Sequence, residues 1–159
     1  MMGLDWVLLR QLRERRQIAA QRSLAREREA AGLRERQLQQ AQGELARQQE
    51  VKRALWRDEI AERAGGFSVD QLRGASSWSR ALDRQILQAA AGVLQAHQQM
   101  QAQQQRVDDS REQLRRSAGE LQAAEQMHER ERAQQRRMQE ARLEDAAEEA
   151  ALQSWVATR

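Results

Sequence analysis

A seven-residue repeat of apolar side chains runs through the second half of the chain. From Ile86 to Leu121 every seventh residue is Ile, Val, Met or Leu, and the sequence contains no proline. Seven residues make two turns of a helix that winds around another helix, so these side chains line one face. Leucines at multiples of the same interval mark the first half. The pattern predicts a coiled-coil seam made of these residues: Leu24, Leu38, Leu45, Ile86, Val93, Met100, Val107, Leu114 and Leu121.

The composition leaves room for only a thin core. Aromatic residues make up 3% of the chain and charged residues 32%. In the second half of the chain, the residue three positions after each seam residue is small or polar. Such side chains permit a partner helix to approach closely. These companion residues are Ala89, Ala96, Gln103, Ser110, Ser117 and Ala124. Because Ala, Leu, Arg, Glu and Gln are good helix formers, we expect an all-α fold.

Glycine and serine interrupt the helical pattern once. The pair Gly65-Gly66 and the later Gly74 predict a turn, and Ser68 with Gln71 fits a capping box, which favours a short helix inside the turn. We therefore expect a long two-helix antiparallel coiled-coil hairpin with a short helical element in the turn. The expected parts of this single domain, residues 1–159, are helix one at about 4–63, the turn at about 64–77, helix two at about 78–152 and a C-terminal tail at 153–159.

The position of the turn also predicts the register of the two helices. A turn over residues 64–77 pairs positions whose numbers sum to about 138 to 145. Leu45 then lies opposite Val93 or Met100, Ser76 or Ser77 caps helix two, and helix two outruns helix one from about Glu144. The alternative is a parallel homodimer of two continuous helices, which requires the glycine pair to be helical.

The chain lacks the groups that most enzyme sites require. His97 and His128 lie far apart on one predicted helix, and no phosphate-binding glycine loop, HExxH or GxSxG pattern is present. We interpret His128 as a packed or partly solvated seam residue, and acidic pairs such as Asp108-Asp109 as solvated. We expect no enzymatic activity, no cofactor and no metal site.

Arginine is abundant, but acidic residues balance it. The chain has 27 basic and 24 acidic residues, for a net charge of +3. Pairs at i,i+4 spacing, such as Arg10 with Glu14, support a solvated helix face. No aromatic residues alternate with the arginines to stack on bases, so we expect no nucleic-acid partner. No apolar run is long enough to span a membrane, and the absence of cysteine excludes disulfides, so we expect a cytoplasmic protein without membrane insertion.

The aromatic residues lie toward the chain ends and around the turn. Trp is a favoured anchor of protein interfaces, so these positions favour contacts with partners. A second interpretation is that the three aromatic residues near the turn form a small cluster that closes the hairpin. Both interpretations remain open for Trp56, Phe67 and Trp78, whereas Trp155 has less of its own chain to pack on.

The layout of the whole chain resembles the stalk proteins of type III secretion, which form the FliJ family of flagella and its YscO and HrpO counterparts in injectisomes. The resemblance rests on chain size, on an Arg-, Gln- and Glu-rich helix from the N-terminus, and on two short segments. The first segment reads Phe67-Ser68-Val69-Asp70-Gln71-Leu72, and the second, at the start of helix two, reads Trp78-Ser79-Arg80-Ala81-Leu82-Asp83-Arg84-Gln85-Ile86.

This resemblance implies a non-enzymatic two-helix stalk whose paired termini enter the pore of a hexameric secretion ATPase and whose hairpin end faces the cytoplasmic domain of the export gate. Handling of export chaperones is a further implied role. By the family pattern, the gate contact falls on Trp78 and Leu82. The flagellar pattern continues with a small residue and a histidine where this chain has Gln85 and Ala89, which favours the injectisome branch.

At the other end of the stalk, the aromatic anchors of the chain ends and their neighbours are expected to contact the ATPase. They are Trp6 and Leu9 near the N-terminus, with Trp155 and Val156 near the C-terminus. The implied location is the cytoplasm, peripherally associated with the secretion apparatus at the inner membrane.

Overall fold

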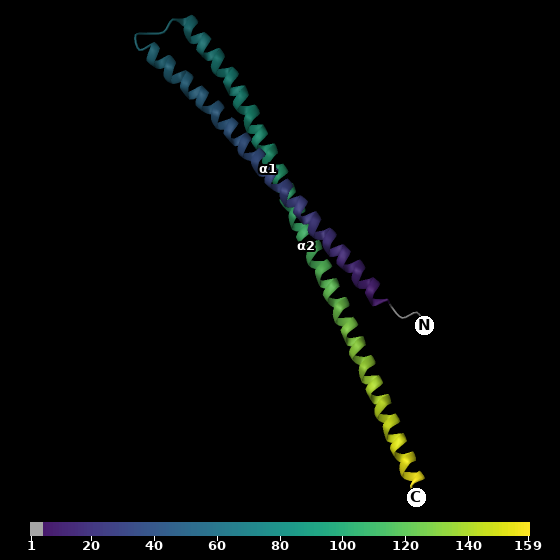
Figure 1. The fold of residues 1–159 in the computed structure, drawn as a ribbon. Coiled ribbons are helices and arrows are strands. Elements are labelled where there is room, and N and C mark those ends of the chain that lie inside the picture. Colours follow the sequence, from purple (N-terminus) through teal and green to yellow (C-terminus); the bar gives the residue numbers. More distant parts are fainter. Residues whose placement is uncertain (1–4) are drawn as a thin grey trace. The chain divides into compact units, whose positions relative to one another are not determined.

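The computed structural model describes residues 5–159. Two α-helices occupy nearly all of them, since α1 spans Trp6–Glu62 and α2 spans Val69–Ala157 (Figure 1). No strand occurs in this part of the chain, which confirms the all-α expectation. The helices divide into two compact units, residues 23–111 and residues 5–22 with 112–159, and each is described in turn. The expectation of one domain stays a prediction.

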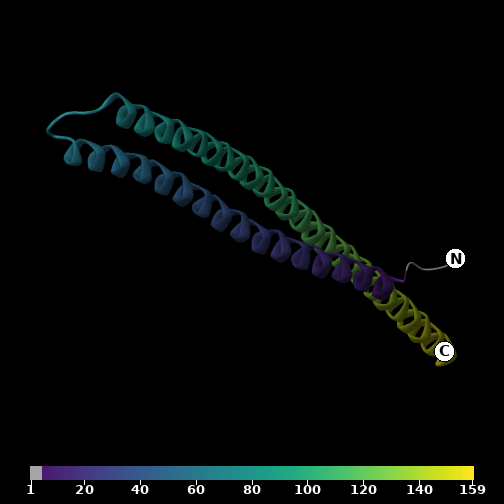
Figure 2. The ribbon, with the colours of Figure 1, turned by 90° about the horizontal axis from the view of Figure 1, so that it is seen from above.

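Residues 23–111 form an antiparallel helical hairpin. In Figure 2 the segments of α1 and α2 on either side of the turn lie side by side. The Lys52 ammonium pairs with the Asp83 carboxylate, and the Arg34 guanidinium donates to the Gln99 side-chain oxygen at 3.0 Å. Residue numbers fall on α1 as they rise on α2, which confirms the predicted hairpin.

The core of this hairpin is thin. Its buried apolar residues are Leu24, Leu38, Ala75, Leu82 and Val107. Gln103 and Ser110, two of the companion residues, are buried as well, whereas seam residues such as Met100 are half-buried. Small companion side chains let the two helix backbones approach closely. The companion residues are therefore at least as buried as the larger seam residues. The Gln103 side-chain nitrogen donates to the Glu27 backbone carbonyl at 3.0 Å and to the Glu27 carboxylate, so this buried donor is paired.

The turn between the helices is short. Gly66 has a φ of 124°, the one positive φ among residues 5–159, and its amide donates to the Arg63 carbonyl at 3.0 Å. The capping box predicted after it is present, because the Ser68 hydroxyl accepts from the Gln71 amide at 3.3 Å and the Gln71 side chain accepts from the Ser68 amide at 3.2 Å. The capping box therefore lies at the N-terminus of α2 itself, which begins at Val69.

The separate short helix predicted inside the turn is therefore wrong. Its residues are the first turns of α2, which passes through Gly74 without a break and needs no cap at Ser76 or Ser77. A single glycine in a helix costs only about 1 kcal/mol relative to alanine, which a long helix tolerates. Likewise, most of the predicted tail at 153–159 is helical, because α2 continues to Ala157.

The shorter turn also changes the register. Lys52 pairs with Asp83 and Arg34 with Gln99, and these residue numbers sum to 135 and 133, below the predicted 138 to 145. The helices are displaced by about one heptad from the prediction. Because the displacement is close to the sequence period, the same faces still meet.

Residues 5–22 and 112–159 form the second unit. The Asp5 carboxylate caps α1 by accepting from the Val7 amide at 3.1 Å and the Leu8 amide at 3.2 Å. Across the two helices, Arg13 pairs with Glu120. Ala20 and Ala124 are buried, and the seam residues Leu114 and Leu121 are half-buried.

Beyond Ala133, α2 has no covered residue. Every residue from 134 to 159 is exposed. The unpaired part of α2 thus starts about ten residues earlier than the predicted overhang at Glu144, in keeping with the displaced register. Among residues 5–159, no helix has a stretch apolar enough to cross a membrane.

Candidate docking surfaces

Trp78 is the most exposed aromatic side chain near the turn. Its residue is 64% exposed and lies on α2, where it lines a shallow groove together with Leu55 on α1 and Gln71 and Gly74 on α2. The helices on both sides of this groove are anchored by the turn. A large aromatic surface held on a fixed helix has little conformational entropy to lose on binding, so Trp78 is suited to contact a partner.

The other residues of the predicted gate contact differ in accessibility. Gln85 is exposed and Ala89 is half-buried, but Leu82 is only 5% exposed. Leu82 precedes Ala89 by seven residues and so belongs to the row of companion residues that faces α1. The implied contact between Leu82 and the gate is thus not available in this conformation. The heptad period alone could have placed Leu82 in the core.

Of the two interpretations left open for the turn aromatics, the closing cluster is not supported by any stacked ring pair near the turn. Within residues 5–159 the one pair of stacked aromatic rings is far from the turn in sequence and consists of Trp6 and His128. Phe67 instead packs against a cation, with the Arg63 guanidinium 5.6 Å from its ring centroid, and remains 48% exposed. Among the described residues, the rings of Trp56, Phe67 and Trp78 thus form no stacked pair with one another.

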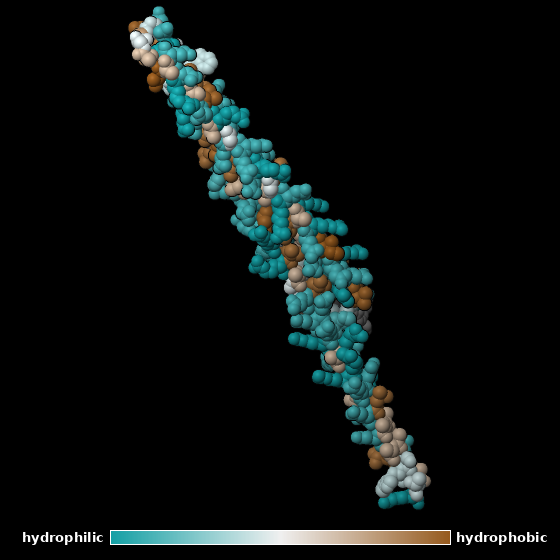
Figure 3. All heavy atoms as spheres, turned by 60° about the vertical axis from the view of Figure 1, so that its left-hand side comes forward, coloured by the Kyte–Doolittle hydropathy of each residue, from teal (hydrophilic) through white to brown (hydrophobic). Residues whose placement is uncertain are grey.

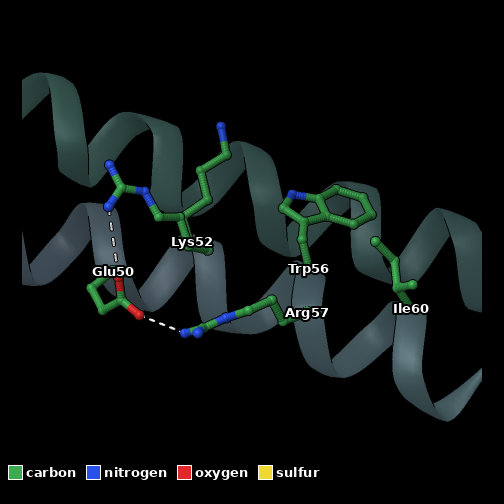
Figure 4. Close-up of a pocket in the computed structure, with 6 residues that line it drawn as sticks. Glu50, Lys52, Trp56, Arg57 and Ile60 are labelled. Carbon is green, nitrogen blue, oxygen red and sulfur yellow. Dashed lines mark hydrogen bonds and ion pairs between the residues drawn. The ribbon is translucent and has the colours of Figure 1, made fainter.

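Trp56 belongs to a second groove, which the sequence reasoning missed. It is lined by residues of α1 alone, and Figure 4 shows Trp56 and Ile60 lying beside each other along the helix. At the other end of the groove the Glu50 carboxylate pairs with both Arg53 and Arg57. The i,i+4 spacing of Trp56 and Ile60 was the signal that could have revealed this groove.

Trp6 is less open than its place near the N-terminus suggested. Its ring stacks on His128 with centroids 5.8 Å apart and planes 20° apart, and the residue is half-buried. Leu9, one turn further along α1, is half-buried too. The stack joins the start of α1 to α2 within the second unit. His128 is a packed, partly exposed residue, as its place in the heptad series predicted.

Trp155 and Val156 lie on the unpaired part of α2 and are 55% and 65% exposed. The Arg159 guanidinium covers one face of the Trp155 ring at 4.1 Å. The preceding stretch, residues 140–149, is acidic and carries five carboxylates: Glu140, Glu144, Asp145, Glu148 and Glu149. This part of α2 therefore combines negative charge with two exposed anchors.

The remaining surface is dominated by polar side chains. Figure 3 shows one face of the molecule, on which hydrophilic residues predominate and hydrophobic residues lie in small separate patches. Many arginines pair with acids one turn away on the same helix, as Arg10 does with Glu14 at 2.9 Å and Arg116 with Glu112 at 3.2 Å. Such exposed pairs contribute only about 0.3–0.5 kcal/mol each, so they favour solubility of the helix face more than stability.

Within residues 5–159, no group of three or more His, Asp or Glu side chains is arranged to hold a metal ion. The exposed surfaces around Trp78, Trp56 and Trp155 are in part apolar, as contacts between proteins require. Comparison of the chain with models of known protein families, with curated proteins and with solved structures found no match.

Proposed function

We propose that this protein is a non-enzymatic central-stalk component of a bacterial type III secretion apparatus of the injectisome type. It couples the hexameric export ATPase to the cytoplasmic domain of the export gate, and it handles export chaperones as a further role. The proposal rests on the resemblance of the chain to the FliJ, YscO and HrpO stalk proteins. The observation that supports it best is the 64% exposure of Trp78, at the position where the resemblance places the gate contact.

Trp78 is the centre of the proposed gate contact. Gln85 follows it by two helical turns and is also exposed, so the two side chains lie on one face of α2. Leu82 contributes indirectly to this contact. Its buried side chain packs α2 against α1 and thereby positions Trp78. Ala89, half-buried next to this face, lets a partner approach α2 closely.

The proposed ATPase contact uses the ends of both helices. Trp155 and Val156 are exposed on the unpaired part of α2, whereas Trp6 and Leu9 are half-buried near the start of α1. The proposed location follows from these partners: the protein is cytoplasmic and peripherally associated with the inner-membrane secretion apparatus. A generic coiled-coil scaffold that binds a partner helix is the alternative function.

The proposal is tested by binding of the purified chain to the export ATPase hexamer and to the gate domain from the same genome. We expect both to bind. Trp78→Ala should weaken gate binding by at least about tenfold, which is the loss typical of an interface anchor, and leave ATPase binding unchanged. Leu33→Ala, at a residue 50% exposed elsewhere on α1, is the matched control.

Absence of binding to both partners would refute the stalk function. Loss of gate binding in Trp78→Ala together with loss of helicity in circular dichroism would show unfolding instead of a lost contact. Binding of a partner helix by this chain, without binding of either secretion component, would favour the scaffold.

A further inference from the structure

Several large apolar side chains of the hairpin of residues 23–111 are exposed or only half-buried, and four of them form a set away from Trp78. Ile60 is 64% exposed and Trp56 half-buried on α1, while Leu87 is 70% and Leu94 is 60% exposed on α2. None of them belongs to the coiled-coil seam. We call these four residues the lateral track.

The Lys52–Asp83 ion pair places the four residues on one flank of the hairpin. Trp56 follows Lys52 by four residues, and Leu87 follows Asp83 by four, so each lies one turn from the ion pair on the same side of its helix. Because the helices are antiparallel, Trp56 lies on the turn side of the ion pair and Leu87 on the other side. The lateral track therefore continues across both helices.

The flank of the lateral track is opposite to the flank that carries Trp78. Ser79 faces α1 and is 9% exposed. At 100° per residue, Trp78 is rotated from Ser79 in one direction, and Asp83 is rotated in the other. The lateral track is therefore distinct from the proposed gate contact, and binding there does not depend on the stalk function.

The length of the lateral track matches a helix. Ile60 is eight residues from Lys52 and Leu94 is eleven from Asp83, so at 1.5 Å per residue the track is about 28 Å long, which is roughly 19 helical residues. A third helix laid along two paired helices buries its apolar stripe between them, as in a helical bundle. An extended strand would find no unpaired sheet edge in the described residues.

The charges beside the lateral track specify the polar side of this partner. Arg53 and Arg57 are both more than two-thirds exposed, and they share the single carboxylate of Glu50. One of the two positive charges is thus not balanced within this cluster. A carboxylate on an incoming helix would complete it, whereas an added cation would be repelled.

We propose that the lateral track binds an amphipathic α-helix of a partner protein, with an apolar stripe facing Trp56, Ile60, Leu87 and Leu94 and acidic residues facing Arg53 and Arg57. Trp56 is the anchor of this contact, because it is half-buried and lines the groove beside Ile60 (Figure 4).

The proposal is tested with two labelled synthetic peptides and the full-length chain. Both peptides carry leucine at heptad positions a and d; one has glutamate and the other lysine at e and g. Fluorescence anisotropy should show binding of the glutamate peptide and at least about tenfold weaker binding of the lysine peptide. Ile60→Asp and Leu87→Asp, both at well-exposed positions, should each weaken binding of the glutamate peptide by about tenfold or more.

A charge reversal makes the test specific. The double variant Arg53→Glu with Arg57→Glu should reverse the preference and favour the lysine peptide. Leu33→Asp, at an exposed apolar position outside the lateral track, should bind as the unmodified chain does, and circular dichroism should show equal helicity in all variants. Equal binding of both peptides, or glutamate-peptide binding that survives Ile60→Asp and Leu87→Asp, would overturn the proposal. Self-association of the chain through these residues, without peptide binding, would also overturn it.

Discussion

Gly66 adopts a φ of 124°, which side-chain-bearing residues rarely populate. Its neighbour Gly65 has no positive φ, and an added methyl group would meet nothing within 4 Å at either glycine. The two glycines therefore differ in backbone conformation and not in available space. The ability of Gly66 to adopt a positive φ therefore decides where the chain reverses direction.

Replacing each glycine separately by alanine should show whether backbone conformation, and not available space, makes a glycine necessary. We expect Gly66→Ala to lower the free energy of unfolding by about 1–3 kcal/mol, because alanine would be strained at this φ. Gly65→Ala should be neutral or slightly stabilising, since it restricts the unfolded chain without strain. Urea denaturation of the two variants compares them directly, and an equal loss in both would contradict the role of φ.

Ser68 is the second residue on which the turn depends. Ser68→Ala removes the hydroxyl that accepts from the Gln71 amide and should cost about 1 kcal/mol of the free energy of unfolding. Ser77→Ala is the matched control, because Ser77 is exposed inside α2, where alanine is the better helix former. Thermal unfolding measures both variants. A larger loss of stability in Ser77→Ala than in Ser68→Ala would mean that α2 is capped at Ser77 and not at Ser68.

At the scale of the helices, the register is decided by few contacts. The apolar repeat permits displacement by a whole heptad, since each displacement brings equivalent faces together. Polar pairs do not repeat in this way. Lys52 faces Asp83 in the structure, but a displacement of seven residues would place it opposite Ala90. Likewise, buried Gln103 finds the Glu27 carbonyl in one register.

A double-mutant cycle tests this register. Lys52→Asp should be destabilising because it faces Asp83, and the exchanged pair Lys52→Asp with Asp83→Lys should recover most of the loss. The expected coupling is about 0.2–1 kcal/mol, as for other partly exposed ion pairs, and it should shrink at high salt. Independent, additive effects of the two substitutions would favour another register.

At the scale of the whole molecule, helix formation and helix packing are separable. Residues 134–157 of α2 are helical but wholly exposed, whereas residues 82–110 lie in the hairpin and include several buried positions. A helix without a tertiary partner depends on its own propensity, which is marginal in water. The long α2 helix thus contains regions of unequal local stability.

Hydrogen exchange should reveal this difference. We expect the amides of residues 134–157 to exchange at least about a hundredfold faster than those near Val107, because a local opening there exposes no buried surface. Mass spectrometry of peptic fragments measures both regions in one experiment. Equal protection would mean that the C-terminal part of α2 is covered by a second molecule in solution.

The sequence by itself determined the helical fold, the capping box and the residues that line the interface, because period, propensity and caps are local properties. It also indicated exposure of Trp155, since few residues of its own chain could cover it. It placed the turn with error, because Gly74 is permissive and does not by itself end a helix.

Only the tertiary structure decided the register, the stacking of Trp6 on His128 and the existence of the lateral track. A heptad repeat leaves the register open to whole-heptad displacement. Likewise, a flank between two helices exists only once both are paired, and its composition depends on which turns come together. These properties follow from contacts between residues distant in the chain, which no local pattern specifies.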